Sequence, residues 1–392
     1  MDSSFYDNQF TGFMAYNPRT KDTVFNHNGE RYFTPASNTK IFTLFTALQY
    51  LPQNVPALKY AVHQDTLIVQ GTGDPSFLHP YFKDSTALDF MRNYKFVKLV
   101  TDNYANDKFG PGWAWEDYDM YYSPERSAFP LYGNVLSISN VNGDLETYPE
   151  FLGSQTTYAT FNKRRDFNEN KFYYKMTRKD TIEVPFVLDT SMVKKLWNNL
   201  LPNKVEFIPY AKAKTDQTLY SIPSDSLYKR MMYVSDNFLA EQILILASST
   251  IADTLDADPI RKSILENQLK FLKQKPKWYD GSGLSNYNLF TPLSLIQVLE
   301  KLYTDIPRER LFNFFPIGGK SGTLKGWFGG DRAPYIYAKT GTLSSAYCLS
   351  GYLITNSGEV LIFSFMNNNY VTSSNVVKPE MQKMLEYLRD NY

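Results

Sequence analysis

The stretch FTPASNTKIFTLFTAL, residues 33–48, places a serine three positions before a lysine at the start of an apolar run. We expect a helix from about Ser37 to Tyr50, and because apolar residues cover most of its surface, this helix should be buried. Residues three apart on a helix share a face, so Ser37 and Lys40 can contact each other. Burial disfavours a charged amine, and a neutral Lys40 could take the proton that makes Ser37 a poor nucleophile.

The spacing of serine and lysine is weak evidence when it stands alone. Ser191/Lys194 and Ser226/Lys229 repeat it, although both pairs lie in polar sequence that favours exposed helices. Only Ser37 precedes a strongly apolar helix, so we select it as the candidate nucleophile.

Length and composition limit the classes of function. A chain of 392 residues favours two to three domains, and a net charge of +1 gives no sign of the basic surface typical of nucleic-acid binders. The single cysteine, Cys348, allows no intrachain disulfide, and His27, His63 and His79 are not spaced as metal ligands. A metal enzyme is therefore not expected, although a site made of carboxylates alone stays open. No cofactor is expected either.

The N-terminal sequence MDSSFYDNQF has no basic and apolar regions of the kind that form a signal peptide. An exported protein whose leader had been removed would look the same. Because no run of about 18 apolar residues occurs, we expect no membrane insertion of the given chain.

The order of elements predicts an α+β fold with an inserted, mostly β domain. A hairpin at 10–33 precedes the first helix, and the strands YIYAKTGT, AYCLSGYLI and EVLIFSFMNN precede a terminal helix. We expect the hairpin to join these strands in one antiparallel sheet flanked by helices. The catalytic domain would then comprise residues 1–56 and 219–392, and the insertion residues 57–218.

A second candidate element is Ser235-Asp236-Asn237, which lies between two predicted helices. Ser235 could pass a proton between Lys40 and a leaving group, and Asn237 could hold Lys40 and a substrate amide. The alternative is an ordinary helix cap, since these residue types are the preferred caps. Ser373/Asn375 has the same form.

A third candidate element, Lys339-Thr340-Gly341-Thr342, lies at the end of a predicted strand. Lys339, Thr340 and Thr342 could bind a carboxylate, and Gly341 would let a substrate backbone lie against the strand. The amides of Ser37 and Thr342 would form an oxyanion hole. The alternative is a plain hairpin. The near copy at 320–323, KSGT, follows two glycines and no strand-like run, so we do not place the site there.

SxxK, then SxN, then KTG, in this chain order, is the signature of the penicillin-recognising active-site serine enzymes, and the chain resembles them. It is most similar to the class C penicillin-binding proteins, the D-alanyl-D-alanine carboxypeptidase/endopeptidase family. The stretches that carry the resemblance are GTGDPSF (71–77), GPGWAWEDY (110–118), VSDNFLAEQIL (234–244), DGSGLSNYNLFTP (280–292) and AKTGTLSSAYCLSGYL (338–353).

The resemblance implies a serine β-lactamase/transpeptidase-like domain and a concrete reaction. Ser37 would attack the D-Ala-D-Ala bond of a peptidoglycan stem peptide with Lys40 as base, and water would release the acyl-enzyme. Lys339 and the two threonines would take the terminal carboxylate. β-Lactams would acylate Ser37 and leave slowly. Such a substrate implies a periplasmic location, with no nucleic-acid partner.

Two alternatives to the carboxypeptidase remain open at this point. One is a β-lactamase or esterase on the same scaffold, and the other is a catalytically silent peptidoglycan-binding protein. One departure from the family concerns the inserted domain, from which relatives can place an acidic residue near the side-chain amine of the substrate. We align Tyr132 with that position, which leaves recognition of the diamino acid in doubt.

Overall fold

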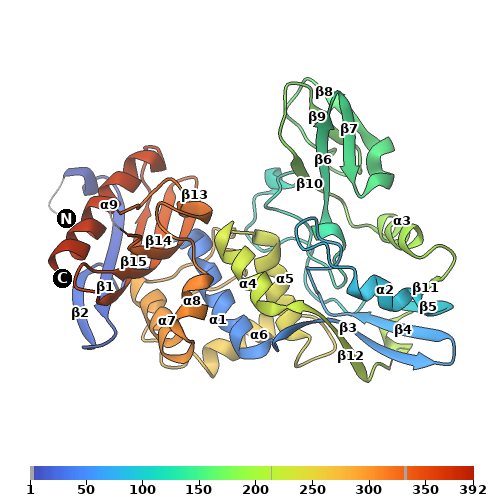
Figure 1. Ribbon diagram of the computed structural model, residues 1–392, viewed down its shortest axis with the longest axis horizontal. Coiled ribbons are helices and arrows are strands. Elements are labelled where there is room, and N and C mark those ends of the chain that lie inside the picture. The colour runs from blue at the N-terminus through green and yellow to red at the C-terminus, as the bar shows by residue number, and fades with distance from the viewer. Residues whose placement is uncertain (1–3, 213, 331–332) are drawn as a thin grey trace.

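The two ends of the chain share one five-stranded antiparallel sheet in the computed structural model, which describes residues 4–212, 214–330 and 333–392 (Figure 1). Its strand order is β13-β14-β15-β1-β2. The strands are β1 (Phe10–Asn17), β2 (Asp22–His27), β13 (Ile336–Leu343), β14 (Ala346–Ile354) and β15 (Val360–Asn368). β1 pairs with β15 from Phe10↔Asn368 to Tyr16↔Ile362, so the expected joining of the hairpin to the C-terminal strands is confirmed.

Helices cover both faces of this sheet, which explains why β14 and β15 are apolar along almost their whole length. α9 (Ser374–Asn391) packs Met381 and Leu385 against one face, beside Phe363 and Phe365. α7 (Pro292–Asp305) packs on the other face and is capped by Thr291, whose hydroxyl accepts a hydrogen bond from the Ser294 amide. The two termini lie close together on the outer side (Figure 1).

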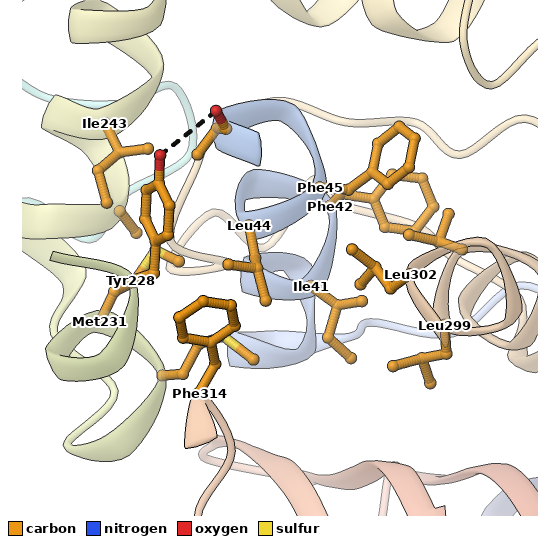
Figure 2. Close-up of a cluster of buried hydrophobic side chains, with 14 of the residues drawn as sticks. Ile41, Phe42, Leu44, Phe45, Tyr228, Met231, Ile243, Leu299, Leu302 and Phe314 are labelled. Atoms are coloured by element: carbon orange, nitrogen blue, oxygen red, sulfur yellow. Dashed lines mark hydrogen bonds between the residues drawn. The ribbon is translucent and has the colours of Figure 1, made fainter. Parts of the chain in front are cut away.

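The helix that follows Ser37 is the centre of a helical core. A 3₁₀ turn, η2 (Ala36–Thr39), leads into α1 (Lys40–Tyr50), so the regular helix begins three residues later than expected. The neighbouring helices are α4 (Ser224–Tyr233), α5 (Asn237–Ser248), α6 (Ala257–Glu266) and α8 (Arg308–Asn313). Figure 2 shows apolar side chains of α1 packed between two groups, Tyr228, Met231 and Ile243 on one side and Leu299 and Leu302 on the other. This packing fixes Lys40 beneath Ser37.

The inserted region holds its own hydrophobic core and three small sheets. The largest has the order β11-β5-β4-β3-β12, and the others are β10-β6-β7 and β8-β9. Its strands are β3 (Asn54–His63), β4 (Thr66–Gly71), β5 (Phe96–Val100), β6 (Val135–Val141), β7 (Asp144–Tyr148), β8 (Thr156–Ala159), β9 (Phe172–Lys175), β10 (Ile182–Pro185), β11 (Val205–Phe207) and β12 (Gln217–Pro223). Its α-helices are α2 (Thr86–Arg92) and α3 (Thr190–Leu200).

The chain enters and leaves the inserted region on neighbouring strands, because β3 and β12 pair antiparallel. This region forms the second lobe in Figure 1, with β6 to β10 at its top. The α+β class and the mostly β insertion are therefore confirmed. Within the described residues, no helix is long and apolar enough to cross a membrane.

Candidate active site

The Ser37 turn brings the hydroxyl and the amine of the first motif into contact. Lys40 Nζ lies 2.9 Å from Ser37 Oγ. Ala36, just before the serine, has a φ of 46°, a left-handed backbone conformation that residues other than glycine rarely adopt. Such strained residues gather at functional sites, where the surrounding structure holds them. Here the Ala36 carbonyl accepts a hydrogen bond from the Thr39 hydroxyl at 2.9 Å, which secures the turn.

Lys40 is fully buried and has two further hydrogen-bond acceptors. Its Nζ donates to Asn237 Oδ1 at 2.7 Å and to the main-chain carbonyl of Ser282 at 2.7 Å. Burial lowers the pKa of Lys40 to about 8, although the carboxylates of Asp280, Glu241 and Asp236 oppose that shift. A neutral amine has two N–H groups, and these two oxygens can take both. The nitrogen lone pair then faces Ser37 Oγ, as a general base requires.

The Ser235-Asp236-Asn237 loop is both a helix cap and part of the site. Asp236 is the cap, because its Oδ1 accepts a hydrogen bond from the Leu239 amide at 3.0 Å. Ser235, with a φ of 62°, projects from the loop toward Lys339, whose Nζ lies 2.8 Å from Ser235 Oγ. Asn237 holds Lys40 through Oδ1 and donates from Nδ2 to the Tyr122 carbonyl at 3.0 Å.

Strand β13 brings the third motif to the same place. Lys339 is fully buried, and its Nζ also donates to the Thr340 carbonyl at 2.7 Å. Burial, and then the positive charge of Lys40, hold the pKa of Lys339 well below its ordinary value. The structure thus brings Ser37, Lys40, Ser235, Asn237 and Lys339 together through contacts between their polar atoms.

Gly341 lies where the serine turn packs directly on β13. A Cβ at this position would lie 2.6 Å from the Pro35 carbonyl oxygen and 3.0 Å from the Ser37 amide nitrogen. This contact alone leaves no room for a side chain, and the placing of a substrate backbone along Gly341 stays a prediction. Asn38 strengthens this contact by donating to the Lys339 carbonyl at 3.0 Å. Thr342 follows with an exposed side chain.

Several members of the site carry no signal in the sequence. The Ser282 and Tyr122 contributions are main-chain carbonyls, which any residue type could supply. The glycines of DGSG offered a partial signal: a Cβ on Gly283 would lie 1.9 Å from the Ala36 carbonyl oxygen, so this loop packs on the serine turn. Thr323, in the rejected KSGT copy, accepts a hydrogen bond from the Thr340 hydroxyl at 2.7 Å.

The alignment of Tyr132 with an acidic position beside the substrate is not supported by its surroundings. Tyr132 is buried in the core of the inserted region, where its ring packs edge-on against Tyr148. The inserted region reaches the site instead through Tyr122, whose hydroxyl donates to Asp117 Oδ1 at 2.8 Å. An aromatic residue in that core cannot replace a carboxylate in the site.

The similar motifs elsewhere serve other purposes, as expected. Lys194 and Lys229 are exposed on α3 and α4, and Ser373 caps α9. His79 is buried in the insertion, where Nδ1 accepts a hydrogen bond from the Tyr81 amide and burial lowers its pKa to about 4. Among the residues that the structure describes, no group of His, Cys, Asp or Glu is arranged to hold a metal ion.

Comparisons with known proteins agree with this geometry. The D-Ala-D-Ala carboxypeptidase 3 (S13) family matches residues 4–193 and 207–392. D-alanyl-D-alanine carboxypeptidase DacB of Haemophilus influenzae is 25% identical over 97% of this chain and 90% of its own. Penicillin-sensitive carboxypeptidase A of Dictyostelium discoideum is 24% identical over 88% of this chain and 80% of its own. The crystal structure of penicillin-binding protein 4 (dacB) from H. influenzae has the same fold, with a TM-score of 0.70 at 22% identity over 94% of this chain and 92% of that one.

Proposed function

The chain belongs to the D-Ala-D-Ala carboxypeptidase 3 (S13) family, and from this premise we propose how its residues divide the reaction. It is a serine D-alanyl-D-alanine carboxypeptidase, a hydrolase of the DacB kind. Its substrates are the peptides of peptidoglycan, and its inhibitors are β-lactams. The observation that carries the assignment of roles is the contact of Lys40 Nζ with Ser37 Oγ at 2.9 Å, inside a site that buries the amine.

In the acylation step, Ser37 Oγ attacks the carbonyl carbon of the penultimate D-alanine and its proton passes to neutral Lys40. The amides of Ser37 and Thr342 stabilise the oxyanion, because hydrogen bonds to developing charge lower the barrier. The C–N bond then breaks, and the terminal D-alanine leaves as an amine. Water hydrolyses the resulting ester, and Ser37 regains its proton.

The leaving amine needs a proton. Ser235 delivers it from its hydroxyl and takes up the proton that Lys40 received from Ser37, so Lys40 is neutral again for the hydrolysis step. Its hydroxyl contacts Lys339 Nζ at 2.8 Å, and Asn237 connects the same loop to Lys40. Lys339 binds the terminal carboxylate of the substrate, with Thr340 and Thr342 as hydroxyl donors, and this carboxylate in turn favours the protonated form of Lys339 despite its burial. No cofactor takes part in this scheme.

Residues 1–56 and 219–392 form the catalytic domain in this proposal, and residues 57–218 form the insertion. The insertion reaches the site through the Tyr122 carbonyl, which fixes Asn237. Because the substrate lies outside the cytoplasmic membrane, we place the enzyme in the periplasm.

Product analysis on purified muropeptides tests the proposal. Incubation of a pentapeptide muropeptide with the enzyme should release D-alanine and leave the tetrapeptide, and Ser37→Ala should release none. Cross-linked dimers measure endopeptidase activity in the same experiment. Rapid hydrolysis of a β-lactam without release of D-alanine would identify a β-lactamase instead. No product from either substrate would contradict the proposal.

A further inference from the structure

A buried glutamate lies directly behind the lysine of the active site. Glu241, on α5, is 2% exposed, and its Oε1 accepts a hydrogen bond from the Ser282 amide at 2.7 Å. The carbonyl of the same residue, Ser282, accepts from Lys40 Nζ. A single residue therefore separates the glutamate from the catalytic amine.

The inserted region supplies the cation that neutralises this glutamate. Arg126 Nη1 lies 3.2 Å from Glu241 Oε2, and both side chains are almost fully buried. The guanidinium also donates to the carbonyls of Asp107 and Phe109. Burial and the nearby Asp280 carboxylate raise the pKa of Glu241, and the guanidinium of Arg126 opposes this shift, so Arg126 helps Glu241 to hold its charge and its geometry.

The direction of the Ser282 carbonyl decides where the lone pair of Lys40 points. If this oxygen moved, a neutral Lys40 would lose one of its two acceptors and could turn an N–H toward Ser37 instead. Gly281 and Gly283 flank Ser282, so its peptide groups have little intrinsic restraint. Asp280 holds the peptide group that carries this carbonyl, because its Oδ1 accepts from the Gly283 amide at 2.8 Å, and Glu241 holds the preceding peptide group through the Ser282 amide.

We propose that Glu241, paired with Arg126, is a positioning residue that fixes the Ser282 carbonyl and so aims the lone pair of Lys40 at Ser37. This inference rests on the proposed function. It also gives the inserted region a part in catalysis, because Arg126 belongs to that region. Substrate binding does not involve the pair directly, so its loss should act on the chemical step.

The charges that surround Lys40 make the inference measurable. Asp280, Glu241 and Asp236 each raise the pKa of Lys40, and the second cation, Lys339, lies in the same site. Arg126 faces Glu241 from the other side. Removing only the charge of Glu241 should therefore move the acid limb of the rate–pH profile to lower pH, whereas removing the side chain should disturb the geometry as well.

The test compares the second-order rate of acylation by a fluorescent penicillin, measured from pH 6 to 10, in four proteins. In Glu241→Ala the rate of acylation should fall on the order of 10- to 100-fold, which is the expected effect of a small displacement of the reacting groups. Glu241→Gln keeps an oxygen for the Ser282 amide, so it should recover most of that loss and show its acid limb at lower pH than the wild type. KM for a D-Ala-D-Ala peptide should change little in either variant.

The matched control is Glu125→Gln. Glu125 is also buried, accepts from the Leu188 amide at 3.0 Å and pairs with Lys108, but the contacts of its carboxylate lie away from Lys40. It should behave as the wild type. The inference is overturned if folded Glu241→Ala is acylated at the wild-type rate. If Glu241→Ala does not fold, Glu241→Gln decides the question, because a loss of about tenfold or more despite the retained oxygen would contradict the inference. A wild-type protein that is not acylated at all would instead contradict the proposed function.

Discussion

The pattern lysine, hydroxyl residue, glycine, threonine occurs twice in the chain, at 320–323 and at 339–342, and the two copies lie side by side in the fold. Lys339 is fully buried on strand β13, whereas Lys320 is exposed on a turn before η7 (Gly322–Leu324). Only the buried lysine contacts Ser235. The chemistry of a lysine therefore depends on the element that carries it and on its burial, which the four-residue pattern does not encode.

The two glycines of these copies are more alike than the two lysines. A Cβ on Gly341 would lie 2.6 Å from the Pro35 carbonyl oxygen, beside the Ser37 turn. A Cβ on Gly322 would lie 2.4 Å from the carbonyl oxygen of Tyr233, two residues before Ser235. Each copy thus packs against a segment that carries a serine of the site. The copy at 320–323 supports the site without supplying its lysine.

Replacing each of the two lysines with methionine tests the comparison most directly. In Lys339→Met we expect the rate of acylation by a fluorescent penicillin to fall by about 10³-fold, because one cation contributes to both the proton path and the carboxylate site. Lys320→Met should stay within about twofold of the wild type, since an exposed side chain far from reacting atoms contributes little. A large loss in Lys320→Met would reverse the assignment.

The melting temperatures of the same two variants test how burial of the lysine affects the stability of the fold. Lys339→Met should raise Tm, because it removes an amine whose charged form is disfavoured in the interior. Lys320→Met should leave Tm unchanged. A lower Tm in Lys339→Met would mean that the buried amine stabilises the fold.

The pH dependence of acylation should show the burial of Lys40 beside Lys339. With the pKa of Lys40 lowered to about 8, the rate should rise with pH up to about that value and fall about tenfold for each unit below it. Lys320→Met should keep this limb in place. A rate that does not change between pH 6 and 9 would exclude Lys40 as the base.

The same pKa predicts how the stability of the fold depends on pH. The pKa of Lys40 is about 8 in the folded chain and about 10.4 when exposed, so the unfolded chain binds more protons between these values. The contribution of Lys40 to the free energy of unfolding should therefore increase from pH 8 to pH 10. Urea denaturation at these pH values, compared with Lys40→Met, isolates this contribution.

Substitutions of the two glycines should differ less in their effects on activity and stability than substitutions of the two lysines. Gly341→Ala pushes β13 away from the Ser37 turn, and we expect a loss of about 10- to 100-fold in acylation rate. Gly322→Ala is strained by its φ of 55° and its contact with Tyr233, so it should mainly lower Tm. Equal losses of activity in both would show that both copies position catalytic groups.

The smallest effect is expected at the threonines. Thr340 donates to Thr323 Oγ1 at 2.7 Å, and Thr323 keeps its own O–H for a bound carboxylate. Thr323→Val should therefore raise KM for a D-Ala-D-Ala peptide by about 2- to 10-fold, the worth of one hydrogen bond, and leave kcat nearly unchanged. Thr323→Ser is the control that retains the hydroxyl. An unchanged KM in Thr323→Val would exclude a role in substrate binding.

The sequence predicted what depends on periodicity and on side-chain motifs. The apolar helix after Ser37 and the joining of the hairpin to the C-terminal strands follow from local patterns, and the structure has both. Ser37, Lys40 and Asn237 could be selected because their side chains carry the chemistry.

The rest of the site depends on contacts that side-chain identity does not encode. The carbonyls of Ser282 and Tyr122 are backbone groups, and Thr323 belongs to a segment whose lysine points elsewhere. Tyr132 is a similar case, because the sequence does not show that its side chain lies in the core of the inserted region rather than in the site. Only the three-dimensional packing of the inserted region settles that question.

The attachment site of penicillin tests the central claim most directly. Benzylpenicillin is incubated with the protein, the intact mass is measured, and the modified peptide is sequenced by mass spectrometry. We expect one adduct per chain on Ser37, and none in Ser37→Ala or, at neutral pH within the same time, in Lys40→Met. An adduct on another residue, or an unmodified Ser37 in a folded wild-type protein, would contradict the account.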